Sequence, residues 1–393
     1  INIKFYMGNP LIVEVDIADL EVGHYVIKIE KQLGKFNLTS AGHIKSEKVI
    51  SNLRSKQVLS LLIDKSKTIK VSANNTPRAK MAEDVKQAKA IFNESKDIQK
   101  SLFSQALSGA NIELSPVIEV CNKSIDAIFN NPDSLACIVN IREKDQYLLE
   151  HSVAVSVYIT LFARYLELDR NVIEQLSVGA FLHDIGKIMI PDEILNKPGK
   201  LTEEEFTVMK THANHSINII EKTPNVSELS LEIAALHHEK LDGTGYPFQV
   251  KAENISQYGR MITICDIFDA LTATRVYKKS FSHPKGFAIL RELAQKNHLD
   301  VGLVEHFIKC IGVFPIGSLV QLDSKKLAII EERNENSPTK PKVRSFYSVK
   351  ANNFVKTEDI DLSEGDDFIE RGVCAEEFDL DMSKIIEMLM MDG

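Results

Sequence analysis

Two pairs of adjacent side chains that can bind metal ions constrain this chain more than any other feature of its sequence. The first pair is His183-Asp184, and the second is His237-His238. Because consecutive helical positions point about 100° apart, one such pair can serve two metal ions, or one ion and its surrounding contacts. Imidazole beside carboxylate favours iron, manganese, nickel or zinc over calcium. The sequence therefore predicts a transition-metal site.

The region that holds both pairs is predicted to be helical. Nearly every segment from about residue 115 to residue 312 has helical character, with helix starts at Ser115-Pro116 and at Thr202. A single histidine on a helix is more often a packed residue than a metal ligand. Six of the 11 histidines fall between residues 151 and 238, however, and this clustering favours metal binding.

The compound pattern resembles a known family. His183-Asp184 is followed by Lys187, and His237-His238 is followed by Gly245-Tyr246-Pro247. Together these motifs resemble the HD-GYP branch of the HD phosphohydrolase superfamily, and the resemblance covers residues 115–330. It implies seven metal ligands: His151, His183, Asp184, His212, His237, His238 and Asp266. Seven ligands suit two octahedral ions, bridged by Asp184 and a hydroxide, better than one tetrahedral zinc.

The resemblance also bears on a third metal ion and on the metal identity. Some family members hold a third ion through a glutamate one turn before the first histidine, and this chain has Tyr147 there. Glu143 and Glu150 lie nearby but at other helical positions, so we expect two divalent transition-metal ions, iron or manganese. His215 shares a helix face with His212 but matches no ligand position.

Further residues are implied to act on the substrate. Lys187 lies three positions after Asp184, so it can bind a phosphate oxygen or protonate the leaving group. Arg275 and Lys278 match the basic pair that grips substrate phosphate in the family. Without the resemblance, the same basic run would be interpreted as a solvated helix end. Two further residues are Tyr246, which offers an aromatic face or a hydroxyl to the ligand, and Asp269, which is placed to orient a ligand or the attacking water.

The implied activity is hydrolysis of cyclic di-GMP to pGpG by a metal-bridging hydroxide, with GMP as the product of a second cut. One alternative keeps the chemistry and changes the substrate to 3′,3′-cGAMP. Another is a catalytically weak receptor that binds a cyclic dinucleotide without consuming it. The intact motifs argue against the receptor. A homodimer is one option for the assembly.

The flanking segments predict a mainly α-helical protein with a small α/β domain before the helices and a short β-rich cap after them. The predicted domains are residues 1–75, a helical linker at 76–114, the catalytic domain at 115–314 and a cap with an acidic tail at 315–393. Expected strands and helices, in chain order, are 11–15, 25–29, 47–56 (helix), 60–63, 68–71, 81–107 (helix), 319–322, 327–332, 343–349 and 385–391 (helix). The 81–107 helix either packs on its own chain, which we favour, or links two subunits.

Composition narrows the class further. A net charge of −8 argues against binding of polymeric nucleic acid but leaves room for a small anionic ligand. No apolar run approaches the roughly 20 residues of a membrane span. Five cysteines without CxxC spacing indicate reduced thiols in a cytoplasmic protein. Because the chain begins with Ile1 rather than Met, we expect native residues before it.

Overall fold

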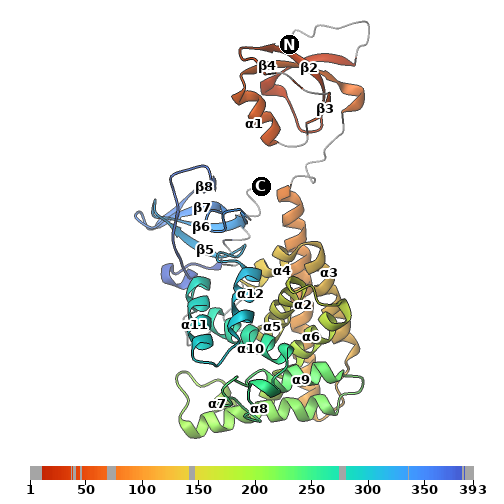
Figure 1. Ribbon diagram of the computed structural model, residues 1–393, viewed down its shortest axis with the longest axis vertical. Helices are drawn as coiled ribbons and strands as arrows, with labels where there is room; N and C mark the ends of the chain where they lie inside the picture. The colour runs from red at the N-terminus through yellow and green to blue at the C-terminus, as the bar shows by residue number, and fades with distance from the viewer. Residues whose placement is uncertain are drawn as a thin grey trace. The chain divides into compact units, whose positions relative to one another are not determined.

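The computed structural model describes residues 11–36, 38, 41–44, 47–68, 77–140, 147–273, 280–334, 336–382 and 385. Contacts divide the chain into two units, residues 1–80 and residues 81–393. The described part of the chain is mainly helical and carries two small sheets, so the predicted fold class is confirmed (Figure 1).

The first unit is a small α/β fold. Its antiparallel sheet has the strand order β1-β4-β2-β3, and one helix, α1, packs with it. The central strand β4 buries nearly every side chain, and Leu61 and Ile63 are fully buried. The elements are β1 (Ile12–Asp16), β2 (Tyr25–Gln32), β3 (Gly42–His43), α1 (Glu47–Ser55) and β4 (Val58–Asp64). Thr68 follows a 3-10 turn, and the rest of the strand predicted at 68–71 lies outside the described residues.

The long helix α2 (Pro77–Ser108) packs on its own chain. It buries Ala88, Phe92 and Leu102 in the core of the larger unit. On its polar side the amine of Lys123 donates to the carboxylate of Glu94. The apolar residues that identify this helix in the sequence therefore serve intramolecular packing.

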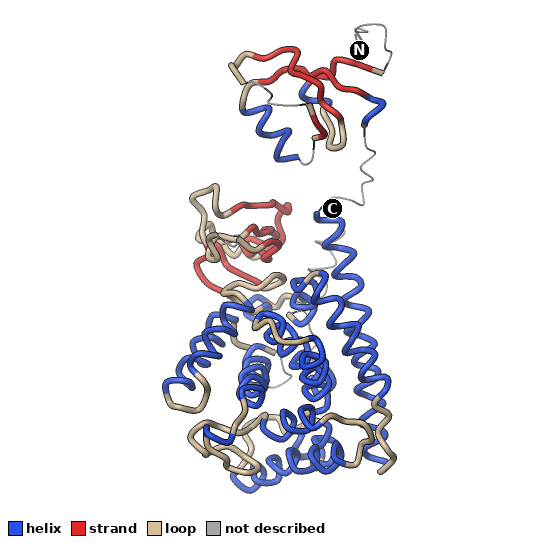
Figure 2. The backbone as a smooth tube through the Cα atoms, turned by 45° about the vertical axis from the view of Figure 1, so that its right-hand side comes forward, coloured by secondary structure: helices blue, strands red, loops and turns tan. Residues whose placement is uncertain are grey.

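The helices that follow α2 in the larger unit lie close together (Figure 2), and they enclose one continuous hydrophobic core. They are α3 (Ser115–Asn130), α4 (Pro132–Val139), α5 (Tyr147–Tyr165), α6 (Arg170–Leu182), α7 (Asp192–Leu195), α8 (Glu203–Glu221), α9 (Glu228–Leu236), α10 (Gln257–Thr272), α11 (His283–Gln295) and α12 (Val301–Ile311). Helix α5 contacts α6 and α10, while α9 contacts α6, α8 and α10. These contacts bring residues far apart in the sequence to one place.

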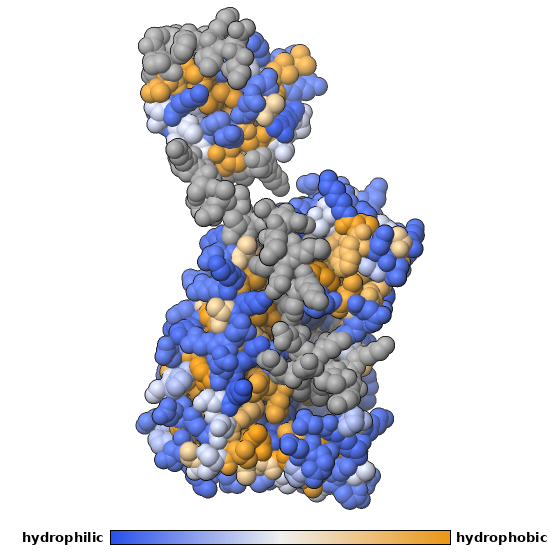
Figure 3. Space-filling view, turned by 180° about the vertical axis from the view of Figure 1, so that it is seen from behind, coloured by the Kyte–Doolittle hydropathy of each residue, from blue (hydrophilic) through white to orange (hydrophobic). Residues whose placement is uncertain are grey.

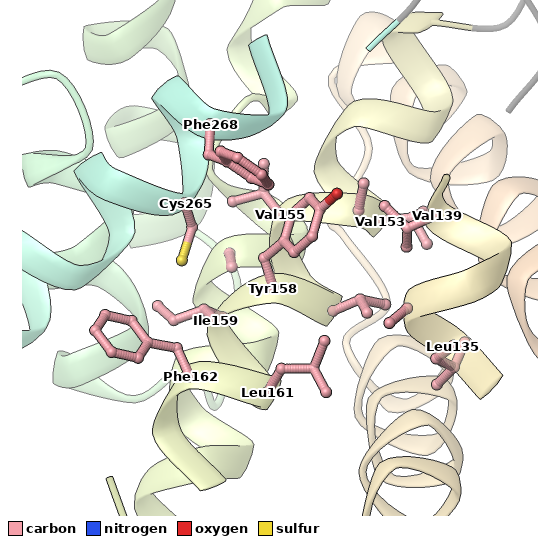
Figure 4. Close-up of a cluster of buried hydrophobic side chains, with 14 of the residues drawn as sticks. Leu135, Val139, Val153, Val155, Tyr158, Ile159, Leu161, Phe162, Cys265 and Phe268 are labelled. Carbon is pink, nitrogen blue, oxygen red and sulfur yellow. The ribbon is translucent and has the colours of Figure 1, made fainter. Parts of the chain in front are cut away.

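Aromatic side chains fill the centre of this core. Tyr158 and Phe162 of α5 face Cys265 and Phe268 of α10 (Figure 4). The ring centroids of Tyr158 and Phe268 are 5.4 Å apart in an edge-to-face arrangement. Burial of large rings in such pairs stabilises the contact between the two helices by more than area alone provides. Helices α5 and α10 are thereby held rigidly, and each carries a predicted metal ligand.

A five-stranded antiparallel sheet follows the helices, with the order β8-β7-β6-β5-β9. One face of it joins the helical core, and the other buries Leu327 and Phe346 in a small core of its own. The strands are β5 (Leu319–Leu322), β6 (Lys326–Glu332), β7 (Lys342–Ser348), β8 (Asn353–Asp361) and β9 (Ile369–Gly372). The sequence predicts β5 to β7 but misses β8 and β9, because their exposed charged residues hide the alternation.

Surface and thiol chemistry agree with the composition. No helix among the described residues is long and apolar enough to cross a membrane. The face shown in Figure 3 is largely hydrophilic, with hydrophobic patches between the hydrophilic regions. All five cysteines are free thiols, and Cys121, Cys137 and Cys265 are buried. Apart from Ile385, the helix predicted at 385–391 lies outside the described residues.

Candidate metal centre

Five segments of the helical unit converge on one buried cluster of imidazoles and carboxylates. All seven predicted ligands lie in this cluster, and they form two groups. Within each group, the ligand atoms all lie within 4.8 Å of one another. The first group is Asp184, His212, His237 and His238, and the second is His151, His183 and Asp266. Six of the seven residues are buried, and His238 is partly exposed.

Helix ends position several of these side chains. His183 follows the last residue of α6, and Asp184 begins the short 3-10 helix η5 (Ile185–Met189). His237 likewise ends α9. At a helix end the backbone turns, so consecutive side chains can point into one cavity from different directions. His238 follows His237 in the turn after α9, while His151, His212 and Asp266 come from the interiors of α5, α8 and α10.

Asp184 belongs to the first group but presents one oxygen to that group and the other oxygen to the second group. Its Oδ1 is 3.3 Å from Nε2 of His212 and 3.8 Å from Nε2 of His237. Its Oδ2 is 3.2 Å from Nε2 of His151 and 3.3 Å from Nε2 of His183. A carboxylate with this orientation can bridge two cations.

Hydrogen bonds fix the tautomers of three imidazoles. Nδ1 of His183 donates to the carbonyl of Ala180 at 2.6 Å, and His237 does the same with Ala234 at 2.6 Å. His212 donates to the carbonyl of Met209 at 2.7 Å. Because Nδ1 faces a carbonyl, Nε2 of each ring points into the cluster.

Two of these nitrogens have no hydrogen-bond partner. Nε2 of His183 and Nε2 of His237 are buried and make no hydrogen bond, and neither does Oδ1 of Asp184. Buried acceptors without partners are costly in a folded protein, so such a group of them needs an explanation. The donor set, nitrogen and carboxylate oxygen, is that of a divalent transition metal. The residues therefore fit metal ions.

The fourth oriented imidazole is that of His151. Its Nδ1 lies 2.7 Å from Oδ2 of Asp269, one helical turn after Asp266 on α10. Its Nε2 lies 3.0 Å from Oδ1 of Asp266. A carboxylate behind an imidazole fixes ring orientation and raises ligand basicity. Asp269 thus contacts a predicted ligand from behind.

Burial and charge set the protonation states. Burial lowers the pKa of His238 to about 3, and burial is also the largest cause that lowers the pKa of His237 well below its usual value. Both rings are therefore neutral at physiological pH, as metal binding requires. Burial by itself would raise the pKa of Asp184, but the charges of Lys187 and His183 hold it well below the usual range.

Gly186 lets η5 pack directly against α8. A Cβ at this position would lie 2.2 Å from the carbonyl oxygen of His212 and 2.3 Å from the nitrogen of Ser216. The Gly186 amide instead donates to Oγ of Ser216 at 2.9 Å. The same Cβ would lie 2.8 Å from Cβ of His215, which is outside both ligand groups. Glycine therefore sets the distance between Asp184 and His212.

The comparisons with known proteins agree with this geometry. The model of the HD domain matches residues 136–303, and a domain of unknown function (DUF3391) matches residues 12–117. A cyclic di-GMP phosphodiesterase from Pseudomonas aeruginosa is 33% identical over 286 residues, which are 72% of this chain and 68% of that protein. A cyclic di-GMP phosphodiesterase from Vibrio cholerae is 40% identical over 52% of this chain and 42% of that protein. A 3′3′-cGAMP-specific phosphodiesterase from Vibrio cholerae is 42% identical over 40% of this chain and 35% of that protein.

This chain is a member of the HD-GYP family. The match to the Pseudomonas protein covers more than two thirds of both chains, whereas the chain spans less than half the length of the two Vibrio relatives.

The Gly-Tyr-Pro loop of this HD-GYP protein lies against the double histidine. A Cβ on Gly245 would lie 2.5 Å from Cα of Glu239, and the Tyr246 amide donates to the carbonyl of His238 at 3.2 Å. The rings of Tyr246 and His238 have centroids 4.5 Å apart. Tyr246 therefore covers one side of the candidate metal centre.

Glu239 holds the Gly-Tyr-Pro loop in place, a role that the sequence does not predict. Its carboxylate is buried and accepts three backbone N–H groups from the residues after the loop, those of Phe248 at 2.7 Å, Gln249 at 3.0 Å and Val250 at 3.2 Å. It thus ties the loop to the helix end that carries His237-His238. The signal in the sequence is an acid placed between two histidines and a glycine-rich turn.

Replacing Glu239 with Gln should loosen the loop. Both carboxylate oxygens of Glu239 accept backbone N–H groups, so the NH2 group of the new amide will face a backbone donor in either orientation. At least one hydrogen bond is therefore lost. We expect a loss of about 1.5–3 kcal/mol in unfolding free energy, the range for hydrogen bonds to charged groups. Hydrogen exchange at residues 248–250 should accelerate, whereas the exposed control Glu253→Gln should leave it unchanged. Equal protection in both variants would show that the carboxylate does not hold the loop.

The other predicted residues are placed as follows. Lys187 donates to Oδ2 of Asp184. Arg275 and Lys278 lie outside the described residues, as do Glu143 and the side chain of Tyr147. The carboxylate of Glu150 lies 3.2 Å from Nζ of Lys96 on α2, and Glu150 belongs to neither ligand group.

Proposed function

We propose that this chain is a metal-dependent phosphodiesterase that hydrolyses cyclic di-GMP to linear pGpG. The observation that carries the proposal is the position of Asp184, with one oxygen toward His212 and His237 and the other toward His151 and His183. Two cations held a short distance apart are the usual means of activating a phosphodiester toward in-line displacement.

The two ligand groups would hold two divalent ions, iron or manganese, bridged by Asp184. Such ions lower the pKa of water and neutralise charge that develops on phosphate. Nε2 of His212 and Nε2 of His238 lie 3.1 Å apart, which suits two ligands of one ion with bonds of about 2.1 Å. Asp269 would hold His151 in the orientation that binding requires.

Other side chains of this protein would bind the substrate and deliver a proton. Lys187 is mostly buried beside Asp184, so its amine can meet a phosphate oxygen at the metal centre or deliver a proton to the leaving O3′. Tyr246 would form a wall of the substrate site beside His238. Arg275 would grip the other phosphate through its planar guanidinium, with Lys278 as a second positive charge.

A second candidate substrate is 3′,3′-cGAMP, favoured by the similarity to the 3′3′-cGAMP-specific enzyme from Vibrio cholerae. The two ligand groups would not discriminate between bases, because the ions they hold would contact phosphate and water. Base choice therefore depends on residues outside the two ligand groups.

Product analysis of metal-loaded protein with each dinucleotide tests the proposal. We expect cyclic di-GMP to give pGpG, with GMP appearing only if a second bond is cut. A higher kcat/KM for 3′,3′-cGAMP would select the second substrate. Binding of both dinucleotides without any product would identify a receptor and refute the phosphodiesterase.

A further inference from the structure

An aromatic side chain outside the metal centre continues the row of rings that begins at His238. Phe206, on the first turns of α8, is 47% exposed, so one face of its ring is open to solvent. Its centroid is 6.4 Å from that of Tyr246, and the two ring planes are 86° apart. Tyr246 in turn lies 4.5 Å from the ring of His238. The row therefore leads from a metal ligand to solvent.

A cation accompanies this exposed ring. Nζ of Lys210, one helical turn after Phe206, lies 5.4 Å from the centroid of the Phe206 ring. The pair offers an aromatic surface beside a positive charge, which is the chemistry that proteins use for nucleobases next to phosphates. In a nucleotide, one ribose separates the base from the phosphate. A ligand with phosphate at the metal centre would thus carry its base outward, past Tyr246.

We propose that Phe206 is a stacking surface for a nucleobase of the substrate. This inference rests on the proposed phosphodiesterase function and adds the residue that recognises a base. Stacking on an aromatic ring tolerates guanine and adenine alike. Phe206 would therefore favour dinucleotides over phosphodiesters without bases, rather than one base over the other.

A structural role competes with this proposal. Thr202 is the N-cap of α8 and forms a capping box with Glu205, so Leu201 and Phe206 occupy the two positions of a hydrophobic staple. A staple needs an apolar side chain but not an aromatic one. Leucine at position 206 would therefore preserve a staple and abolish stacking, which separates the two roles.

The experiment compares Phe206→Ala, Phe206→Leu and Phe206→Trp in the metal-loaded protein. Substrates are cyclic di-GMP and methyl p-nitrophenyl phosphate, a phosphodiester without a nucleobase. We expect the Ala and Leu variants to raise KM for cyclic di-GMP roughly 5- to 150-fold, as loss of one stacked base would. The Trp variant should stay close to wild type. Activity toward the base-free ester should be unchanged in all three.

Phe129→Ala is the matched control. Phe129 on α3 is 43% exposed and has the guanidinium of Arg164 5.5 Å from its ring, but it belongs to no site described here. Its loss should leave KM unchanged. A normal KM in Phe206→Leu, or an equal loss with the base-free ester, would overturn the stacking proposal while leaving the phosphodiesterase intact. Failure of the wild-type protein to hydrolyse cyclic di-GMP would instead refute the function itself.

Discussion

Replacing Asp184 with Ala should abolish cyclic di-GMP hydrolysis and reduce metal content while leaving the helical fold intact. The substitution removes the one carboxylate that faces both ligand groups, so neither group keeps its shared ligand. Metal ions contribute several kcal/mol to such reactions, so the rate should fall by roughly 10³-fold or more. Turnover, metal content and the circular dichroism spectrum should be measured on the same preparation.

Asp169→Ala is the control for this variant. Asp169 is exposed at the start of α6, and its side chain makes no capping hydrogen bond. Its removal should leave metal content and turnover unchanged. Normal activity with full metal content in Asp184→Ala would show that Asp184 is not a ligand shared by the two groups.

Replacing Gly186 with Ala should have the largest effect on stability. The added methyl would lie 2.2 Å from the carbonyl oxygen of His212 and 2.3 Å from the Ser216 nitrogen, and both are backbone atoms of α8. Because backbone cannot rotate away, η5 and α8 must separate. The cost should reach or exceed the upper end of the about 1–3 kcal/mol typical of overpacking. Metal content should fall with it, since Asp184 and His212 lie on the two separated elements.

The denaturant midpoint and the metal content of Gly186→Ala should be compared with those of Gly302→Ala. A methyl at Gly302 would meet only Oδ1 of Asp300, at 3.4 Å, so this control should fold as well as wild type or slightly better. If both variants are equally stable, the close packing of η5 against α8 does not require glycine at position 186.

The candidate site could be assembled from the sequence because two pairs of its predicted ligands occur as motifs and the resemblance to the HD-GYP family implies the others. His183-Asp184 and His237-His238 are adjacent in the chain, and the structure brings them together with His151, His212 and Asp266 in one cluster. The roles of these residues in metal binding are the subject of the tests above. The helices were predictable from their start signals, such as Ser115-Pro116 and Thr202, and from the apolar spacing of residues 81–107.

What the sequence could not supply are contacts that depend on close packing. Glu239 shows no helical or strand pattern, and its function as an acceptor appears only when residues 248–250 fold back onto it. The exposure of Phe206 likewise follows from where α8 lies, not from its own helical pattern. Strands β8 and β9 were missed because hydrogen bonds to β7 and β5, rather than hydrophobic alternation, hold them in the sheet.

The most direct test is a titration of manganese or iron, without oxygen, into chelator-treated protein while cyclic di-GMP hydrolysis is followed. The two ligand groups predict that activity rises from background and saturates at two equivalents per chain, with pGpG as the first product. Saturation at one or at three equivalents, or full hydrolysis by the chelator-treated protein, would contradict a two-metal centre bridged by Asp184.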